Sequence, residues 1–151
     1  MTFKKKSKDL NQYFSLRESL IRFLREDIGQ GDLTSEYVVD KELKSFSFII
    51  CKSELAVVAG LEEAQIIFDM CKCDSKVLVK DGDVVKNGCK VMTIKGRTTS
   101  ILKAERTALN LIMRMSGTAT DTKKFVDIVR TVSKDIRITG TRKTAPGLRF
   151  F

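Results

Sequence analysis

The sequence has no histidine among its 151 residues. Histidine supplies the common ligands of catalytic zinc and the base of Ser-His-Asp triads, so its absence excludes those sites within this chain. No apolar run approaches the roughly 18 residues that a membrane span requires. The N-terminus is basic but has no apolar stretch of the signal-peptide kind. We therefore expect a cytoplasmic protein with no membrane partner.

Aromatic residues are scarce as well, at 7% of the chain, while the formal net charge is +9. This charge favours anionic partners, but it does not distinguish nucleic acid from phosphorylated metabolites or acidic small molecules. No stripe of lysine and arginine interleaved with aromatic residues appears along the sequence. The composition therefore predicts no nucleic-acid partner.

Cysteine is present but sparse, and no pair has zinc-finger spacing. The four cysteines are Cys51, Cys71, Cys73 and Cys89. Only Cys71 and Cys73 are close in sequence, and a C-x-C pair is a poor zinc-binding pattern. We interpret all four as reduced, structural thiols and predict no metal site.

The chain does contain the composition of an ordinary globular domain, with 42% hydrophobic and 31% charged residues. Ser15 and Glu18 form a capping-box pattern, which predicts a helix that begins at Ser15 and stops at Gly29. The next segment is rich in glycine and acids. Asp27 and Asp32 could hold a divalent metal there, but a structural turn on a flexible link is the favoured interpretation.

Residues 45–94 alternate between strand and helix patterns. The alternation of 45–51, with Phe46, Phe48 and Ile50 on one side, predicts a half-buried strand. Further strands are predicted at 55–59, 77–79 and 91–94, with an amphipathic helix over 61–71 and a turn at Asn87-Gly88. Together these patterns predict an α+β fold with a small, mainly antiparallel sheet and helices.

A helix over 100–115 carries two charged residues near its apolar arc. Glu105 falls inside this arc on a helical wheel, and Arg106 lies at its edge. A buried carboxylate needs a cationic or hydrogen-bonding partner. The favoured interpretation is a structural ion pair at the edge of the core. The functional alternative is that Arg106 projects toward an anionic ligand or across a subunit boundary.

The C-terminal part of the sequence predicts a helix, a strand and a basic loop. Residues 116–120 are predicted to break the preceding helix, and a new helix and a strand at 136–139 follow. The loop after it places Arg142 and Lys143 side by side next to Pro146-Gly147. Such a loop suits an anion held by an arginine fork and a compact ammonium, but a solvated basic turn is an equal alternative.

Four segments of the sequence together resemble the quinolinate phosphoribosyltransferase (nicotinate-nucleotide pyrophosphorylase, carboxylating) family. They are residues 26–36 (EDIGQGDLTSE), 56–61 (AVVAGL), 105–110 (ERTALN) with 115–120 (MSGTAT), and 140–149 (GTRKTAPGLR). The resemblance implies that quinolinate and phosphoribosyl pyrophosphate react to give nicotinate mononucleotide, CO2 and pyrophosphate, a step of NAD biosynthesis that uses Mg²⁺.

The same resemblance implies roles for individual residues. Arg106 would reach quinolinate in the neighbouring subunit's site of a homodimer. Thr141, Arg142 and Lys143 would line the pocket, with Arg142 on quinolinate and Lys143 as the catalytic residue near the reacting centre. Cation forks suit a substrate with two carboxylates and a partner with phosphate and pyrophosphate.

The resemblance also implies two domains. Residues 1–116 would form the α+β N-terminal domain of the family, which is similar to an α/β hammerhead, and 117–151 would begin an α/β barrel with its first helix, strand and loop. The family's later histidine, its other quinolinate-binding cations and the acidic groups for ribose and Mg²⁺ have no match here. We therefore expect a truncated or fragmentary member, or half of a split protein, with little activity alone. Two alternatives are a non-catalytic accessory subunit of a full-length homologue and a molybdenum-transport-associated phosphoribosyltransferase-like protein.

Overall fold

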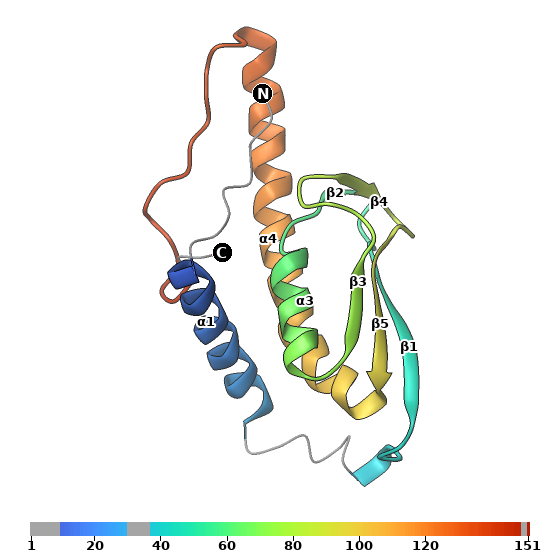
Figure 1. The fold of residues 1–151 in the computed structure, drawn as a ribbon. Coiled ribbons are helices and arrows are strands. Elements are labelled where there is room, and N and C mark those ends of the chain that lie inside the picture. Colours follow the sequence, from blue (N-terminus) through green and yellow to red (C-terminus); the bar gives the residue numbers. More distant parts are fainter. Residues whose placement is uncertain (1–9, 30–36, 149–150) are drawn as a thin grey trace.

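The computed structural model describes residues 10–29, 37–148 and 151, and it has an α+β fold (Figure 1). Its elements are α1 (Leu10–Ile28), β1 (Lys44–Ile50), β2 (Leu55–Val57), α3 (Leu61–Met70), β3 (Asp74–Val77), β4 (Val84–Lys86), β5 (Lys90–Arg97) and α4 (Thr98–Val132). The predicted third strand lies slightly earlier in the chain than expected, and β4 was not predicted.

The strands form two small antiparallel sheets, as the sequence predicts. One has three strands in the order β1-β5-β3, and the other pairs β2 with β4. Helices α3 and α4 lie side by side over one face of the three-stranded sheet (Figure 1). Helix α1 packs against α3 and α4 on the side away from the sheet, so the helices and the sheet form successive layers.

The hydrophobic core lies between these layers and joins all of them. The side chains that are completely shielded from solvent come both from the helices and from the three-stranded sheet. They are Leu20 of α1, Ala64 and Ile67 of α3, Met92 of β5, and Ala104 and Ala108 of α4. Because α4 contributes alanines to this stripe, the neighbouring helix can approach its backbone closely.

Strand β1 forms where it is predicted, but its large apolar side chains face outward. Phe46, Phe48 and Ile50 are 51%, 39% and 37% exposed. The alternate residues face the helices, with Ser47 opposite Ile94 in the register of β5. Alternation predicts that one side of the strand is buried, and packing against β5 and the helices decides which side it is.

Helix α1 begins earlier than the predicted capping box. It starts at Leu10, so Ser15 lies inside the helix, where its carbonyl accepts a hydrogen bond from the Ser19 hydroxyl at 3.1 Å. The prediction that Ser15 caps the helix is therefore wrong, because the apolar packing of α1 extends the helix past a local capping signal. The predicted stop is confirmed, since Gly29 has a φ of +54° and its N–H donates to the Arg25 carbonyl.

Helix α4 runs without interruption for 35 residues, so the predicted break at 116–120 is wrong. The hydroxyls there bind the neighbouring strand rather than starting a new helix. Ser116 Oγ accepts from the Ala59 N–H at 3.0 Å, and Thr120 Oγ1 accepts from the Val57 N–H at 2.9 Å. The proposed domain boundary after residue 116 falls within this helix and stays a prediction. Within the described residues, neither α4 nor any other helix combines the length and apolarity needed to cross a membrane.

The predicted strand at 136–139 is not formed, and this prediction is wrong for the chain as described. Ile136 and Ile138 are 54% and 43% exposed in an irregular segment that follows α4. A strand is stabilised by backbone hydrogen bonds to a neighbour, and no described strand pairs with this segment. The backbone of residues 136–139 therefore has no described strand with which to form a ladder, despite its alternating sequence.

Replacing Thr120 with valine should destabilise the fold. The variant leaves the Val57 N–H, on a residue that is only 8% exposed, without its acceptor. We expect the free energy of unfolding to fall by about 1–3 kcal/mol, measured by urea denaturation followed by circular dichroism. Thr122→Val is the matched control, because the Thr122 hydroxyl bonds only within the helix, to the Thr118 carbonyl. Equal effects of the two substitutions would contradict this account.

Candidate functional site

Arg106 lies on the surface of α4 and pairs with Asp27 of α1. Arg106 Nη1 is 3.4 Å from Asp27 Oδ1, and Thr107 Oγ1 donates to Asp27 Oδ2 at 3.5 Å. The side chain of Asp27 is 23% exposed and that of Arg106 is 73% exposed. Arg106 therefore forms an ion pair, but its partner is Asp27 rather than the Glu105 carboxylate for which the sequence predicts a structural pair. Since the guanidinium remains largely accessible, the pair also leaves Arg106 able to meet a further anion.

Glu105 does not lie in the buried stripe, contrary to the prediction. The stripe of α4 runs through Ile101, Ala104 and Ala108, while Glu105 is exposed beside β1. The helical wheel placed Glu105 in the arc because Leu102 and Leu109 flank it. The sequence cannot show that this side of α4 borders an open groove rather than a packed neighbour.

Asp27 belongs to the last turn of α1 and not to a flexible link, so the predicted turn begins later than expected. Gly29 ends the helix directly after it. Asp32, the other candidate metal ligand, lies outside the described residues. Within the described part of the chain, no group of three or more acidic or cysteine side chains is placed to hold a metal ion.

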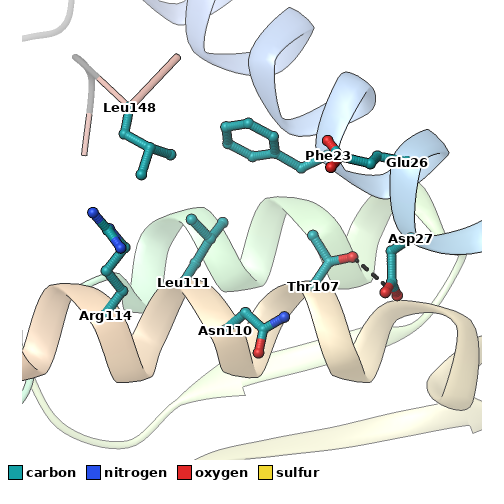
Figure 2. A pocket seen from close by; sticks show the side chains of 8 residues that line it. All are labelled: Phe23, Glu26, Asp27, Thr107, Asn110, Leu111, Arg114 and Leu148. Atoms are coloured by element: carbon teal, nitrogen blue, oxygen red, sulfur yellow. Dashed lines mark hydrogen bonds between the residues drawn. The ribbon is translucent and has the colours of Figure 1, made fainter. Parts of the chain in front are cut away.

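A cavity of about 400 Å³ opens between α1 and α4 beside the Asp27–Thr107 contact. Figure 2 shows the carboxylates of α1 at one end of this cavity and a guanidinium with Leu148 at the other. Its lining consists of Phe23, Glu26, Asp27, Thr107, Asn110, Leu111, Arg114 and Leu148. The cavity thus offers hydrogen-bonding groups of both signs above an apolar floor.

Sequence reasoning missed two polar residues of this cavity, Asn110 and Arg114. Together with Arg106 they recur every four residues, which places all three along one side of α4. That spacing was available in the sequence. The apolar positions of the same helix drew the inference toward core packing instead.

The basic loop approaches the same cavity through its C-terminal end. A tight turn places the Leu148 N–H 3.0 Å from the Ala145 carbonyl, with Gly147 at a φ of +78°, a conformation that favours glycine. A Cβ at Gly147 would lie 3.3 Å from Arg22 Nη2 of α1. The Phe151 ring packs on Phe23 at 5.4 Å between centroids. The Pro-Gly end of the loop is therefore anchored on α1.

The cations of the loop face solvent. Thr141, Arg142 and Lys143 are all exposed. The Thr141 hydroxyl accepts from the Lys143 N–H at 3.2 Å, which shapes the backbone between the two residues. This exposure is compatible with both predicted interpretations, a solvated turn and an anion site.

Arg106 and the loop are on one side of the molecule but at opposite ends of the cavity. Arg106 neighbours the Asp27 end, whereas Leu148 lies at the Arg114 end (Figure 2). The step from Thr107 to Arg114 spans about 10 Å at 1.5 Å per residue. No described contact joins Arg106 to Arg142 or Lys143.

The four cysteines are free thiols, two of them with a raised pKa. Burial raises the pKa of Cys71, and nearby Lys103 opposes the shift. Burial raises the pKa of Cys73 from 9.0 to about 11, and Cys71 and Asp69 add to the shift. Neutral thiols are poor nucleophiles and poor metal ligands, which agrees with their interpretation as structural residues.

Residues 32–116, more than half of the chain, match the family model of the quinolinate phosphoribosyl transferase N-terminal domain. The chain belongs to the quinolinate phosphoribosyltransferase family. The match includes Arg106 and all strands of both sheets.

Individual family members support this assignment. The chain is 39% identical over 128 residues to a probable nicotinate-nucleotide pyrophosphorylase (carboxylating) from Methanothermobacter thermautotrophicus, covering 85% of this chain and 46% of that protein. It is 37% identical over 139 residues to a mitochondrial quinolinate phosphoribosyltransferase (decarboxylating) from Nicotiana glauca, covering 90% and 38%.

Solved structures agree with the sequence relatives. NadC from Streptococcus pyogenes matches with a TM-score of 0.84 and 31% identity over 91% of this chain and 50% of its own. The nicotinate-nucleotide pyrophosphorylase from Francisella tularensis matches with a TM-score of 0.80 and 30% identity, covering 89% and 47%. The chain therefore spans about half the length of these family members.

Cys73 should be alkylated slowly at pH 8, because most of its thiol stays protonated until the pH nears 11. Iodoacetamide labelling followed by peptide mass spectrometry should show its rate rising between pH 8 and 10, with the urea-unfolded chain as the control.

The raised pKa of Cys73 should also make stability depend on pH. The folded state keeps the proton that the unfolded chain has lost, so the free energy of unfolding should fall as the pH rises from 9.0 to about 11. A pH-independent difference from the Cys73→Ala variant would contradict the raised pKa.

Proposed function

We propose that this chain takes part in phosphoribosyl transfer from phosphoribosyl pyrophosphate to quinolinate, giving nicotinate mononucleotide, CO2 and pyrophosphate. In this reaction the pyridine nitrogen bonds to C1′ of ribose as the bond from C1′ to pyrophosphate breaks. The ring then loses its 2-carboxylate as CO2, and the electron pair left at C2 takes up a proton from solvent. Family membership and the exposed cations on the α1–α4 side support the proposal. The relatives named above favour it over the molybdenum-associated alternative.

The observation that carries the proposal is the exposure of the Arg106 guanidinium. Its guanidinium stands on a packed helix, is mostly exposed, and is held by one ion pair at 3.4 Å. A surface pair of this kind contributes little to stability, so a substrate carboxylate can take its place at small cost. A planar guanidinium can also accept a carboxylate in a two-pronged geometry. Arg106 is therefore the proposed quinolinate-binding residue of α4.

The basic loop supplies the other proposed contacts. Arg142 binds a quinolinate carboxylate, Lys143 brings a compact positive charge to the reacting centre, and Thr141 lines the pocket. The anchored Pro-Gly turn limits the motion of the loop, so its cations need less ordering when the anion binds. Lys143 is the proposed catalytic residue.

We propose that the chain works as a homodimer, and the separation of the two parts supports this proposal. Arg106 and the loop's anchor lie at opposite ends of the α1–α4 cavity, about 10 Å apart along the helix. We propose that Arg106 serves the site of a partner subunit, where it meets the loop of that subunit. An accessory role beside a full-length homologue would use the same contact.

Two further elements of the proposal are the cofactor and the location of the protein in the cell. Mg²⁺ is the expected cofactor of the family reaction, and the described residues offer no group of three acidic or cysteine side chains that could hold it. We also propose a cytoplasmic location, although a plant member of the family carries a mitochondrial name.

A complementation assay tests the role of Arg106. A full-length relative whose arginine matching Arg106 is replaced by alanine is mixed with this chain, and nicotinate mononucleotide is measured. We expect the chain to restore activity by supplying Arg106 in trans. The chain carrying Arg106→Ala should restore about ten- to a hundredfold less, the value of a charged hydrogen bond.

The chain carrying Arg130→Ala is the matched control, since Arg130 is an exposed arginine near the far end of the same helix. The Arg130→Ala chain should restore the same activity as the unchanged chain. Lack of mixed dimers in size-exclusion chromatography would contradict the proposed assembly. Mixed dimers without restored activity would contradict the role of Arg106 in the reaction.

A further inference from the structure

The three-stranded sheet has one face that no described element covers. Helices α3 and α4 lie over the other face (Figure 1). On the open face, β1 presents Phe46 and Phe48 next to each other, each more than a third exposed. Large exposed apolar side chains that gather in one row mark an interaction surface more often than isolated ones do.

The two phenylalanine rings are neighbours and each lies near a lysine. Their centroids are 4.8 Å apart and their planes meet at 80°. Lys90 Nζ lies 3.8 Å from the Phe48 ring centroid, and Lys95 Nζ lies 5.3 Å from that of Phe46. The register of β1 and β5 produces this arrangement, because Phe46 pairs with Lys95 across the strands.

The rest of this face is mainly cationic. Its exposed lysines come from all three strands, and they are Lys44, Lys76, Lys90 and Lys95. Asp74 of β3 is an exposed carboxylate opposite Lys95 on the same face. The folded sheet thus gathers an interleaved set of cations and aromatic rings that the linear sequence keeps apart.

The sequence of β1 matches three of the seven specified positions of a known RNA-binding strand. RNA-recognition modules carry K/R-G-F/Y-G/A-F-V-x-F/Y on an antiparallel sheet, and their aromatic rings stack on bases. Residues 44–51 read K-S-F-S-F-I-I-C, which matches at Lys44, Phe46 and Phe48. Small serines replace the glycine and alanine positions. Cys51 replaces the last aromatic residue, which leaves a platform of two rings.

We propose that this sheet face binds single-stranded RNA, with bases stacked on Phe46 and Phe48 and lysines on the phosphates. Lys90 has a flexible stem, so its ammonium leaves the Phe48 ring for a phosphate when a base stacks there. A second copy of the chain fits the face poorly, because two faces of the same positive sign repel each other. This inference is independent of the proposed transferase reaction, and it differs from the composition-based prediction of no nucleic-acid partner.

Fluorescence anisotropy with the whole chain and a labelled, mixed-sequence single-stranded RNA tests the proposal. The double substitution Phe46→Ala, Phe48→Ala should weaken binding about thirtyfold or more, because it removes two base–aromatic stacks of about 1–3 kcal/mol each. Phe125→Ala is the matched control, because Phe125 is an exposed phenylalanine (64%) on α4, away from the sheet. The control should bind within twofold of the unchanged chain, and circular dichroism should show that both variants remain folded.

A second pair of variants separates this site from general attraction by the net charge. Lys76→Glu with Lys95→Glu should weaken binding and lower the slope of log affinity against log salt by about 0.7 for each phosphate that the variant no longer neutralises. Lys134→Glu, at an exposed lysine beyond α4, should change the affinity and the salt slope by no more than a loss of two units of positive net charge explains.

Four results would overturn the proposal. One is unchanged affinity of the double phenylalanine variant, which would leave only non-specific charge attraction. Others are equal binding of single-stranded DNA of the same sequence, or full competition by an acidic polyglutamate peptide, either of which would remove the assignment to RNA. The fourth is self-association of the chain that the phenylalanine substitutions abolish, which would assign the face to a second copy.

Discussion

The close packing of α4 against α3 is the constraint on which the rest of the structure depends. Gly60, at the start of α3, has a φ of +92°, and a Cβ there would lie 2.8 Å from Met115 Sδ of α4. Ala64 of α3 and Ala104 and Ala108 of α4 are completely buried. Small residues on both sides bring the helix axes together, and the larger side chains of the sheet and α1 then close the core from either side. Any larger residue at this contact would separate all the layers at once.

Helix α4 also places polar groups on both of its other sides. Toward the two-stranded sheet, Ser116 and Thr120 bind the backbone of residues 57–59. Toward α1, Thr107 and Arg106 meet Asp27. One rigid helix therefore fixes the position of the small sheet and of the candidate quinolinate arginine relative to the core. The guanidinium is 73% exposed, but the helix that carries it is packed against the core through Ala104 and Ala108.

The sequence predicts those elements well whose own periodicity decides their structure. Strand β1, helix α3 and the Gly29 stop all have local patterns that the packing does not override. The prediction of secondary structure fails where contacts with another element determine the structure of a segment. Residues 116–120 look like a helix break because their hydroxyls suit a cap, yet those hydroxyls have β2 beside them and the helix continues. Residues 136–139 look like a strand but have no described partner strand. For the candidate site, residue types near Arg106 are readable from sequence, whereas its pairing with Asp27 across 79 positions is not.

The layered fold also explains how one basic chain can keep the two proposed anion-binding surfaces apart. The α1–α4 side has isolated cations at fixed points around a cavity, which suits a small ligand with a few defined charges. The open sheet has lysines beside aromatic rings on a flat surface, which suits a repeating, flexible polyanion with stacking groups. The buried α3–α4 layer separates them by more than one helix diameter, about 10 Å, beyond which exposed charges are largely screened at physiological salt. Each surface can therefore bind its ligand without direct electrostatic competition from the other.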